Sequence, residues 1–343
     1  MPIETTVRKF PSIEQFRHAI RKVVDRAHFV RLDDDGAPMF DRTRPLPKLQ
    51  ARGTVKIHGS NAGVRVGDDG ELECWSRTRR ISVDADNMGF ARFVGEREGA
   101  FRRLLGSADN MLYGEWCGKG ILKGCAVHEL DKMFVIFAIS STLNGDRIWL
   151  DLRDFAELEA PADRIYNVMR FGEWALDIDF DHPAESQNRL VAMTEAVEAE
   201  CPLGKHFGVQ GVGEGIVWRL SDDSLTYNSS DFWFKVKGEK HSVTKTKQLA
   251  EVDVEALASL RTFAEVTVTQ LRCEQGVQAL LDEGKPVEQE STGTFLRWMF
   301  NDIVKEESDR MEASGLTKKD IGAAISKQAR TWWFEHINTS AGL

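Results

Sequence analysis

A lysine between an alternating apolar run and a polar turn is the feature that most constrains this chain. Apolar or small residues at positions 49, 51, 53 and 55 alternate with polar ones up to Lys56, and His-Gly-Ser-Asn follows at positions 58–61. This period of two predicts a β-strand that ends in a loop after Lys56. A lysine held at such a place can act as a covalent nucleophile once burial or its neighbours lower the pKa of its amine. By itself the stretch also fits a solvated lysine before a turn.

Length and composition predict a two-domain protein with a sizeable core. The chain has 343 residues, of which 42% are hydrophobic. No apolar run is long enough to span a membrane, and the first residues lack the basic and apolar segments of a secretory signal. The formal net charge of −9 argues against binding nucleic acid by overall charge, but it leaves room for a local basic surface.

The cysteines indicate a reduced protein, which we expect in the cytoplasm. There are five of them, scattered and without a Cys-x-x-Cys pair. Cys117, Cys125 and His128 are spaced too irregularly to predict a zinc site. We expect a monomer with no membrane partner.

Turn signals and alternating apolar residues predict a series of strands in the first two-thirds of the chain. Residues 62–66 and 72–76, separated by Asp-Asp-Gly at 68–70, form a predicted hairpin. If its strands pair antiparallel, the basic cluster at 76–80 comes to the end of the sheet that carries Lys56. Further predicted elements are a helix opened by a capping box at 12–15, a turn at 33–36, a helix from residue 90, strands at 111–116 and 133–139, a hairpin turn at 144–145, a helix at 184–199, and strands at 213–218 and 232–237.

Helical periodicity replaces this pattern after about residue 245. Apolar residues recur at steps of three or four from Leu257 to Leu271, and Thr317 with Asp320 resembles a helix start. We therefore predict an α+β domain of antiparallel sheets with flanking helices over residues 1–245. An all-α domain over residues 246–343 follows it.

Five short motifs, in order, resemble those of the covalent nucleotidyltransferases. Lys-Ile-His-Gly-Ser-Asn at 56–61 resembles motif I in the form found in the RNA ligase 2 branch. The other four are Tyr-Gly-Glu at 113–115 (motif III), Phe-Val-Ile-Phe at 134–137 (motif IIIa), Glu-Gly-Ile-Val at 214–217 (motif IV) and Lys-Val-Lys at 235–237 (motif V). Relatives usually carry an acidic residue where this chain has Val55, and often an aspartate where it has Ala138.

The resemblance implies a nucleotidyltransferase (ATP-grasp-like ligase) domain and the activity of an ATP-dependent RNA ligase in RNA repair. Lys56 would take AMP from ATP, pass it to a 5′-phosphate end of RNA, and a 3′-hydroxyl would then expel it. Each step is an in-line displacement at phosphorus, so the site must supply positioning and positive charge. RNA, as a nicked duplex or paired ends, is the implied partner.

The resemblance also implies roles for individual residues. Lys56, His58, Lys235 and Lys237 would be catalytic, and Glu214 would hold Mg²⁺ or Mn²⁺. Nucleotide contacts would come from Val55, Lys56, Asn61, Arg77, Glu115, Phe137, Glu214, Lys235 and Lys237. Glu115 would accept hydrogen bonds from the ribose, Phe137 would stack on adenine, and Arg77 would meet phosphate. A basic track of Arg79, Lys240, His241 and Lys245 would extend along the RNA backbone.

Cationic neighbours would make Lys56 reactive. A free lysine has a pKa of about 10.4, and one cation ~6 Å away at an effective dielectric of ~20 would disfavour its ammonium by about 3 kcal/mol. Lys235 and Lys237 are two residues apart in a predicted strand, so both side chains project from the same face. We expect them to supply this repulsion.

Three alternatives remain open. A DNA ligase or an mRNA-capping guanylyltransferase shares these motifs, but both normally continue into a small β-barrel, whereas residues 248–343 here are predicted helical. The third is a catalytically inactive RNA-binding relative, although the charged residues of all the motifs are present.

Overall fold

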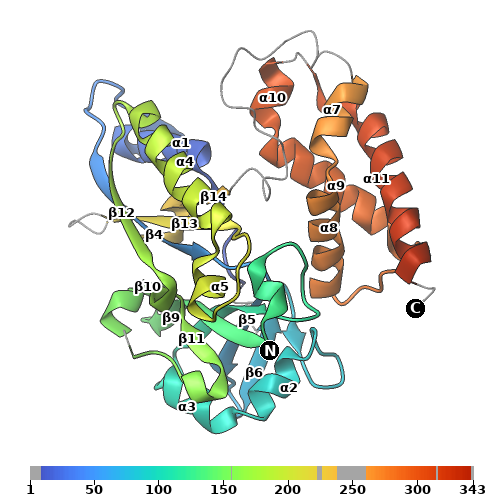
Figure 1. Cartoon of the computed structure of the whole chain (residues 1–343). Coiled ribbons are helices and arrows are strands. Elements are labelled where there is room, and N and C mark those ends of the chain that lie inside the picture. The colour runs from blue at the N-terminus through green and yellow to red at the C-terminus, as the bar shows by residue number, and fades with distance from the viewer. Residues whose placement is uncertain (1–8, 156, 222–225, 238–259, 314–315, 341–343) are drawn as a thin grey trace. The chain divides into compact units, whose positions relative to one another are not determined.

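The chain folds into two compact units, Met1–Gly238 and Glu239–Leu343, each described separately below. The structure, a computed structural model, describes residues 9–155, 157–221, 226–237, 260–313 and 316–340 (Figure 1). The domain boundary predicted between residues 245 and 246 therefore lies outside the described residues. Among the helices that are described, none is both long and apolar enough to cross a membrane.

Two β-sheets form the centre of the first unit. The five-stranded sheet has the order β1 (Glu14–Gln15), β14 (Trp233–Lys237), β13 (Gly215–Ser221), β4 (Lys48–Lys56) and β12 (Glu173–Asp179). The seven-stranded sheet has the order β10 (Asp146–Leu150), β9 (Met133–Leu143), β8 (Met111–Cys117), β5 (Ser60–Val66), β6 (Leu72–Ser76) and β7 (Arg80–Ile81), with β11 (Ile165–Asn167) also beside β9. All pairs are antiparallel except β1 with β14 and β11 with β9.

Alternation along each strand gives the five-stranded sheet two different faces. On one face, Val55, Trp218 and Phe234 are buried, and helices α1 (Phe16–His28) and α4 (Pro183–Ala199) pack against the sheet (Figure 1). Phe16 of α1 contacts Phe234 with ring centroids 4.8 Å apart. The opposite face carries the polar residues of the same strands, Lys56 among them.

The seven-stranded sheet is also two-sided. Trp116 and Phe134 are buried under α2 (Phe90–Gly95) and α3 (Glu98–Leu105), where Phe90 lies 5.1 Å from Phe134. On the other side an aromatic cluster joins this sheet to the five-stranded one, because the rings of Trp149 on β10 and Trp233 on β14 lie 4.9 Å apart. The two sheets therefore face each other.

Short elements complete the first unit. They are the hairpin of β2 (Phe29–Leu32) and β3 (Pro38–Phe40), helix α5 (Pro202–His206), and the 3₁₀ turns η1 (Ala126–Glu129), η2 (Leu152–Phe155), η3 (Pro161–Asp163), η4 (Val168–Phe171) and η5 (Ser230–Phe232).

The described residues of the second unit are helical. They form α7 (Leu260–Thr267), α8 (Gln270–Asp282), the 3₁₀ turn η6 (Gln289–Ser291), α9 (Thr292–Glu306), α10 (Ser308–Ala313) and α11 (Lys318–Ser340). Phe295, Trp333 and their apolar neighbours build a core of their own, and Phe295 stacks on Trp333 with centroids 4.5 Å apart.

Most local predictions are confirmed. The hairpin of β5 and β6 pairs Ala62 with Ser76, so the basic cluster lies at the end of β5 nearest Lys56. The Asn144–Gly145 turn also joins two paired strands, and both of its residues have positive φ. The helix start at 12–15 was wrong: α1 begins at Phe16, because Glu14 and Gln15 pair with β14 instead, and Gln15 makes no side-chain cap.

Candidate functional site

Strand pairing places two lysines in one row of the five-stranded sheet. Gly215, the first residue of β13, pairs with Lys56 on β4 and with Lys237 on β14. Gly215 has no side chain, and its φ of +145° suits glycine. A Cβ there would lie 2.3 Å from the Val236 carbonyl oxygen. The two lysines therefore flank a position that carries backbone only.

Glu214, the residue before Gly215, directs a buried carboxylate between these lysines. Its Oε2 lies 2.7 Å from Lys56 Nζ, and its Oε1 lies 3.1 Å from Lys237 Nζ. The Glu214 side chain is only 3% exposed, whereas 22% of the Lys56 side chain remains accessible. The site thus combines a buried anion with a lysine that solvent or a substrate can reach.

The charges of this cluster set the protonation of both partners. Burial alone would lower the pKa of Lys56, but the carboxylates of Glu214 and Glu115 outweigh it, and the pKa lies above its ordinary value. Burial would likewise raise the pKa of Glu214, but Lys56 and Lys237 hold that pKa well below its ordinary value. The prediction that positive neighbours lower the pKa of Lys56 is therefore wrong for the protein without nucleotide, because the nearest charge to its amine is negative.

His58 links Glu214 to the loop that follows β8. Its Nδ1 lies 3.2 Å from Glu214 Oε2, and its Nε2 lies 3.0 Å from the Lys123 carbonyl oxygen. Both partners are acceptors, so the ring makes both hydrogen bonds at once only when both of its nitrogens carry a proton. His58 thus connects the Glu214 carboxylate to this loop.

The facing sheet brings two further predicted residues together. Asn61 on β5 pairs with Glu115 on β8, and both are partly exposed. Side chains of directly opposed residues project from the same face of a sheet. The negative charge of Glu115 acts on the Lys56 amine, which places this pair near the Lys56–Glu214–Lys237 cluster.

Phe137 lies at a β-bulge. Tyr113 pairs with Ala138 and the next residue, Gly114, pairs with Ile136, so Phe137 has no partner on β8. Its ring is half-buried and lies 5.0 Å from that of Phe10.

Arg219 is a site residue that the motifs did not single out. Its guanidinium donates to the carbonyl oxygen of Phe137 and lies 4.1 Å from the centre of the Trp233 ring. Burial lowers the pKa of Arg219 to about 10. It lies on the same face of β13 as Gly215 and Val217, so the alternation of the strand could have indicated it. It connects the two facing sheets beside Phe137.

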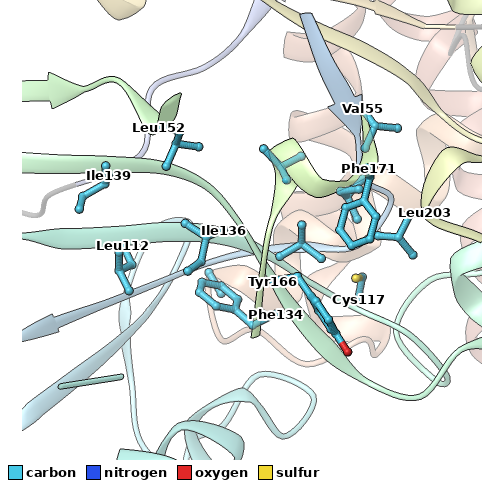
Figure 2. Close-up of a cluster of buried hydrophobic side chains, with 14 of the residues drawn as sticks. Val55, Leu112, Cys117, Phe134, Ile136, Ile139, Leu152, Tyr166, Phe171 and Leu203 are labelled. Atoms are coloured by element: carbon cyan, nitrogen blue, oxygen red, sulfur yellow. The ribbon is translucent and has the colours of Figure 1, made fainter. Parts of the chain in front are cut away.

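Three other predicted residues are located by strand pairing and burial. Val55 is 3% exposed and its side chain lies in the apolar core with Phe171 and Leu203, so only its backbone could contact a nucleotide (Figure 2). Arg77 is exposed in the turn between β6 and β7. Lys235 is half-buried one row further along β14, where it pairs with Val217.

The predicted basic track is only partly described. Arg79 donates to the Ala85 carbonyl oxygen at 3.2 Å, while Lys240, His241 and Lys245 lie outside the described residues.

A metal ion would find one carboxylate here and not a complete protein cage. Among the described residues, no three His, Cys, Asp or Glu side chains gather into a metal site. Burial and the nearby charge of Glu214 raise the pKa of the Cys125 thiol, which therefore stays protonated and is a poor metal ligand. Glu214 is thus the candidate ligand.

The facing antiparallel sheets, with the lysine and glutamate between them, define a nucleotidyltransferase fold. A family model described as RNA ligase matches residues 51–237, more than half of the chain. The chain therefore belongs to the RNA ligase family.

Solved structures of similar proteins are distant. A Naegleria gruberi RNA ligase with PPi is 20% identical, with a TM-score of 0.42, and the match covers 70% of this chain and 61% of that one. A mutant of that enzyme with AMP and Mn is 19% identical, with a TM-score of 0.42 and coverage of 67% and 58%. An archaeal ATP-dependent RNA ligase is 15% identical, with a TM-score of 0.39 and coverage of 90% and 66%.

The chain thus spans about 60% of the N. gruberi chains that it matches. No curated protein matches it significantly in sequence.

Proposed function

We propose that this protein is an ATP-dependent RNA ligase that joins 3′-hydroxyl and 5′-phosphate ends through a lysyl-AMP intermediate. The observation that carries the proposal is the cluster at the strand ends. There the buried carboxylate of Glu214 contacts both lysines, with Lys56 Nζ at 2.7 Å and Lys237 Nζ at 3.1 Å. These are the nucleophile, the acidic residue and the cation that nucleotidyl transfer requires, within a chain of the RNA ligase family.

Lys56 is the proposed nucleophile. Its Nζ would attack the α-phosphorus of ATP, form a P–N bond and expel pyrophosphate; the proton of the amine is lost in this step. The phosphoryl oxygens gain negative charge as the leaving group departs, and Lys237, which is 11% exposed, is placed to stabilise them. The AMP would then move to an RNA 5′-phosphate, and attack by a 3′-hydroxyl would release it.

Glu214 has the character of a ligand for Mg²⁺ or Mn²⁺. Mg²⁺ is usually held by one or two carboxylates together with substrate phosphates, which fits a single buried carboxylate beside a phosphate-binding lysine. A divalent cation there would cancel the negative charge that now stabilises the Lys56 ammonium, so the amine would lose its proton more easily.

The remaining roles follow from residue type and position. Glu115 and Asn61 would hold the ribose from the facing sheet, and Phe137 would stack on adenine. His58 would orient Glu214. Lys235 would contact phosphate oxygens. Arg77 is exposed just after Ser76, which pairs with Ala62 at the start of β5 near Lys56, and would contact the RNA 5′-phosphate.

The helical second unit favours an RNA ligase over the two related enzymes. DNA ligases and capping guanylyltransferases continue into a β-barrel, whereas the described residues from 260 to 340 contain helices and no strand. We further propose that RNA repair of nicked or paired ends is the biological role, that the protein acts as a monomer, and that it works in the cytoplasm.

Covalent labelling tests the proposal directly. Purified protein incubated with Mg²⁺ and ATP labelled at the α-phosphate should retain the label after denaturation, and Lys56→Ala should abolish it. Lys48→Ala is the matched control, because Lys48 begins the same strand but is exposed and paired with Asp179. A label on neither protein, or an equal label on Lys56→Ala, would exclude the proposed nucleophile. Excess GTP that competed better than ATP would favour a guanylyltransferase instead.

Sealing assays then identify the substrate. We expect a nicked RNA duplex to be sealed faster than a nicked DNA duplex or single-stranded RNA. Preference for the DNA nick would assign the protein to the DNA ligases.

A further inference from the structure

Helix α11 of the second unit has one apolar face and one solvent face. Ile321, Ile325, Ala329 and Trp333 recur every four residues and are each 0% exposed, so they fix the side that packs on the helical core. On the side of the helix away from these residues, Lys319, Lys327 and Arg330 are exposed to solvent.

The solvent face of α11 contains a surface hollow. Its lining includes Ala323, Ser326, Lys327, Arg330, Thr331 and Phe334. We call these six residues, with Lys319 one turn before them, the α11 stripe. Ala323 and Ser326, at the N-terminal end of the hollow, are small, and the two cations follow them along the helix, so a bulky anion can approach the helix closely there.

No acidic side chain belongs to the α11 stripe. In the described part of the chain, no carboxylate lies within ion-pair distance of the nitrogens of its three cations. Asp320, the nearest acid in sequence, accepts a hydrogen bond from the Thr317 backbone nitrogen at 2.8 Å and is occupied in starting the helix. Asp320 and Lys319 attract each other, but Lys327 and Arg330 form no ion pair among the described residues, in a chain whose net charge is −9.

We propose that the α11 stripe binds the phosphate backbone of the RNA substrate. This inference rests on the proposed function and adds the surface that holds the RNA away from the reacting ends. Lys319 and Arg330 are about 17 Å apart along the helix at ~1.5 Å per residue. The stripe is therefore long enough to contact several successive phosphates of one RNA strand.

The chemistry of the α11 stripe specifies the backbone and not the base sequence. Lysine, arginine, serine and threonine are the side chains that most often contact phosphate oxygens. No amide side chain, which would read base edges, lines the hollow among the described residues. Binding should therefore depend strongly on salt and weakly on sequence.

A charge-removal variant of the full chain tests the surface. Lys319→Ala, Lys327→Ala and Arg330→Ala together remove three exposed cations, and Arg26→Ala, Arg103→Ala and Arg297→Ala remove the same charge from exposed positions elsewhere. Binding of a fluorescent nicked RNA duplex is followed by anisotropy over a series of KCl concentrations.

The α11 variant should bind RNA about 10- to 100-fold more weakly, and the slope of log K against log salt should fall by about two to three. The control variant should resemble the wild type. Far-ultraviolet circular dichroism confirms that both keep their helices, and Lys327→Glu with Arg330→Glu should weaken binding further than alanine does.

Two outcomes overturn the inference. One is an RNA affinity and salt slope in the α11 variant equal to those of the wild type. The other is unchanged RNA binding together with lost binding of a polyglutamate peptide, which would assign the surface to an acidic protein. Formation of lysyl-AMP needs no RNA and should be unaffected in the variant, so its absence from the wild type would reject the proposed function and not this surface.

Discussion

A single buried carboxylate controls the charge state of the proposed nucleophile. Glu214 is 3% exposed and receives Lys56, Lys237 and His58 within 3.2 Å. Isolated in the interior, such an anion would be strongly unfavourable, and its three partners offset that cost. The same contacts favour the protonated form of Lys56 in the protein without nucleotide. The ligand-free protein is therefore expected to hold its nucleophile in an unreactive form.

The protonation of Lys56 can be measured without any activity. In the ligand-free protein, acetylation of Lys56 by acetic anhydride, followed by mass spectrometry against pH, should give a midpoint above the ordinary value of 10.5. Because folding favours the charged amine, the stabilisation from this pair is complete below the unfolded pKa and is lost as pH rises through the folded pKa. Glu214→Gln removes the main stabilising charge, so the Lys56 midpoint should move down.

Lys48 provides the internal control for this titration. It lies on the same strand and pairs with Asp179 at 2.7 Å, so Glu214→Gln should leave its acetylation profile unchanged. A Lys56 midpoint that stayed the same or rose in Glu214→Gln would show that Glu214 does not govern this amine.

Among the secondary-structure elements, local pattern was informative and long-range pairing was not. Alternation and turn residues predicted β5, β6, β8, β9 and the Asn144–Gly145 hairpin, because each depends on neighbours in sequence. The contact between Lys56 and Glu214 joins residues that are 158 positions apart in the chain (214 − 56). It depends on the register in which β4 pairs with β13, which no local pattern gives. The edge strand β12 was missed for the same reason: nothing near residues 173–179 specifies pairing with β4.

Motif order, rather than element prediction, identified the site residues. It placed Lys56, Glu115, Glu214 and Lys237 on one list, and pairing of the strands brings them to two facing sheets. It could not show Arg219, which belongs to none of the motifs; alternation along β13 indicates only the face on which this arginine lies, and its contact with the bulge at Phe137 depends on the fold. Nor could it give the sign of the Lys56 pKa shift, which depends on where the Glu214 side chain points.

Gly215 should be essential to the row of lysines. An alanine there would bring its Cβ to 2.3 Å from the Val236 carbonyl oxygen and 2.9 Å from Lys237 Cα, so β14 would have to move and carry Lys237 with it. We expect Gly215→Ala to destabilise the first unit by about 2–4 kcal/mol and to abolish lysyl-AMP formation. Chemical denaturation and ATP labelling measure the two effects.

Gly99→Ala is the matched control for this change. Gly99 lies in α3 with no atom within 4 Å of a built Cβ, so alanine should leave labelling intact and change stability by less than about 1 kcal/mol, in the stabilising direction. Full activity in Gly215→Ala would mean that β14 tolerates the added atom.

Arg219 should position Phe137 through its contact with the bulge. Arg219→Gln removes the donor to the Phe137 carbonyl oxygen and the charge over Trp233. If Phe137 stacks on adenine, KM for ATP in lysyl-AMP formation should rise about tenfold, or about 1.4 kcal/mol, with little change at saturating ATP. Arg219→Lys should recover part of the loss because it keeps the charge.

Arg52→Gln tests whether any arginine of this row has the same effect. Arg52 pairs with Arg219 across β4 and β13 but contacts Glu173 at 3.4 Å, so its loss should leave KM near the wild-type value. An equal rise in KM in both variants, or a fall in the rate at saturation alone, would contradict a positioning role for Arg219.

At the scale of the whole molecule, each unit has its own core. The apolar clusters of the first unit contain residues up to Phe234, and the cluster of the second begins at Phe263. Each core is large enough for a cooperative transition, so we expect the two units to unfold separately.

Substitution of Arg272 tests whether the two units unfold separately. Arg272 is 0% exposed in α8, and its guanidinium contacts Asp302 at 2.9 Å, Glu307 at 2.8 Å and the Thr267 carbonyl oxygen at 2.6 Å. Removing one member of a buried ionic network leaves the others without compensation, which typically costs about 3–5 kcal/mol. Arg272→Met should therefore lower the denaturation midpoint of the second unit alone.

Denaturation followed by two probes separates the units. Lysyl-AMP formation reports the first unit, and the fluorine NMR signals of Trp298 and Trp332, beside the helical core, report the second in protein labelled with 5-fluorotryptophan. In Arg272→Met the tryptophan signal should change at lower denaturant while labelling with ATP persists, and the exposed Arg297→Met should shift neither. Loss of both signals at the same denaturant concentration would mean that the helical unit stabilises the first unit. Destabilising the helical unit would then reduce catalysis as well as RNA binding through α11.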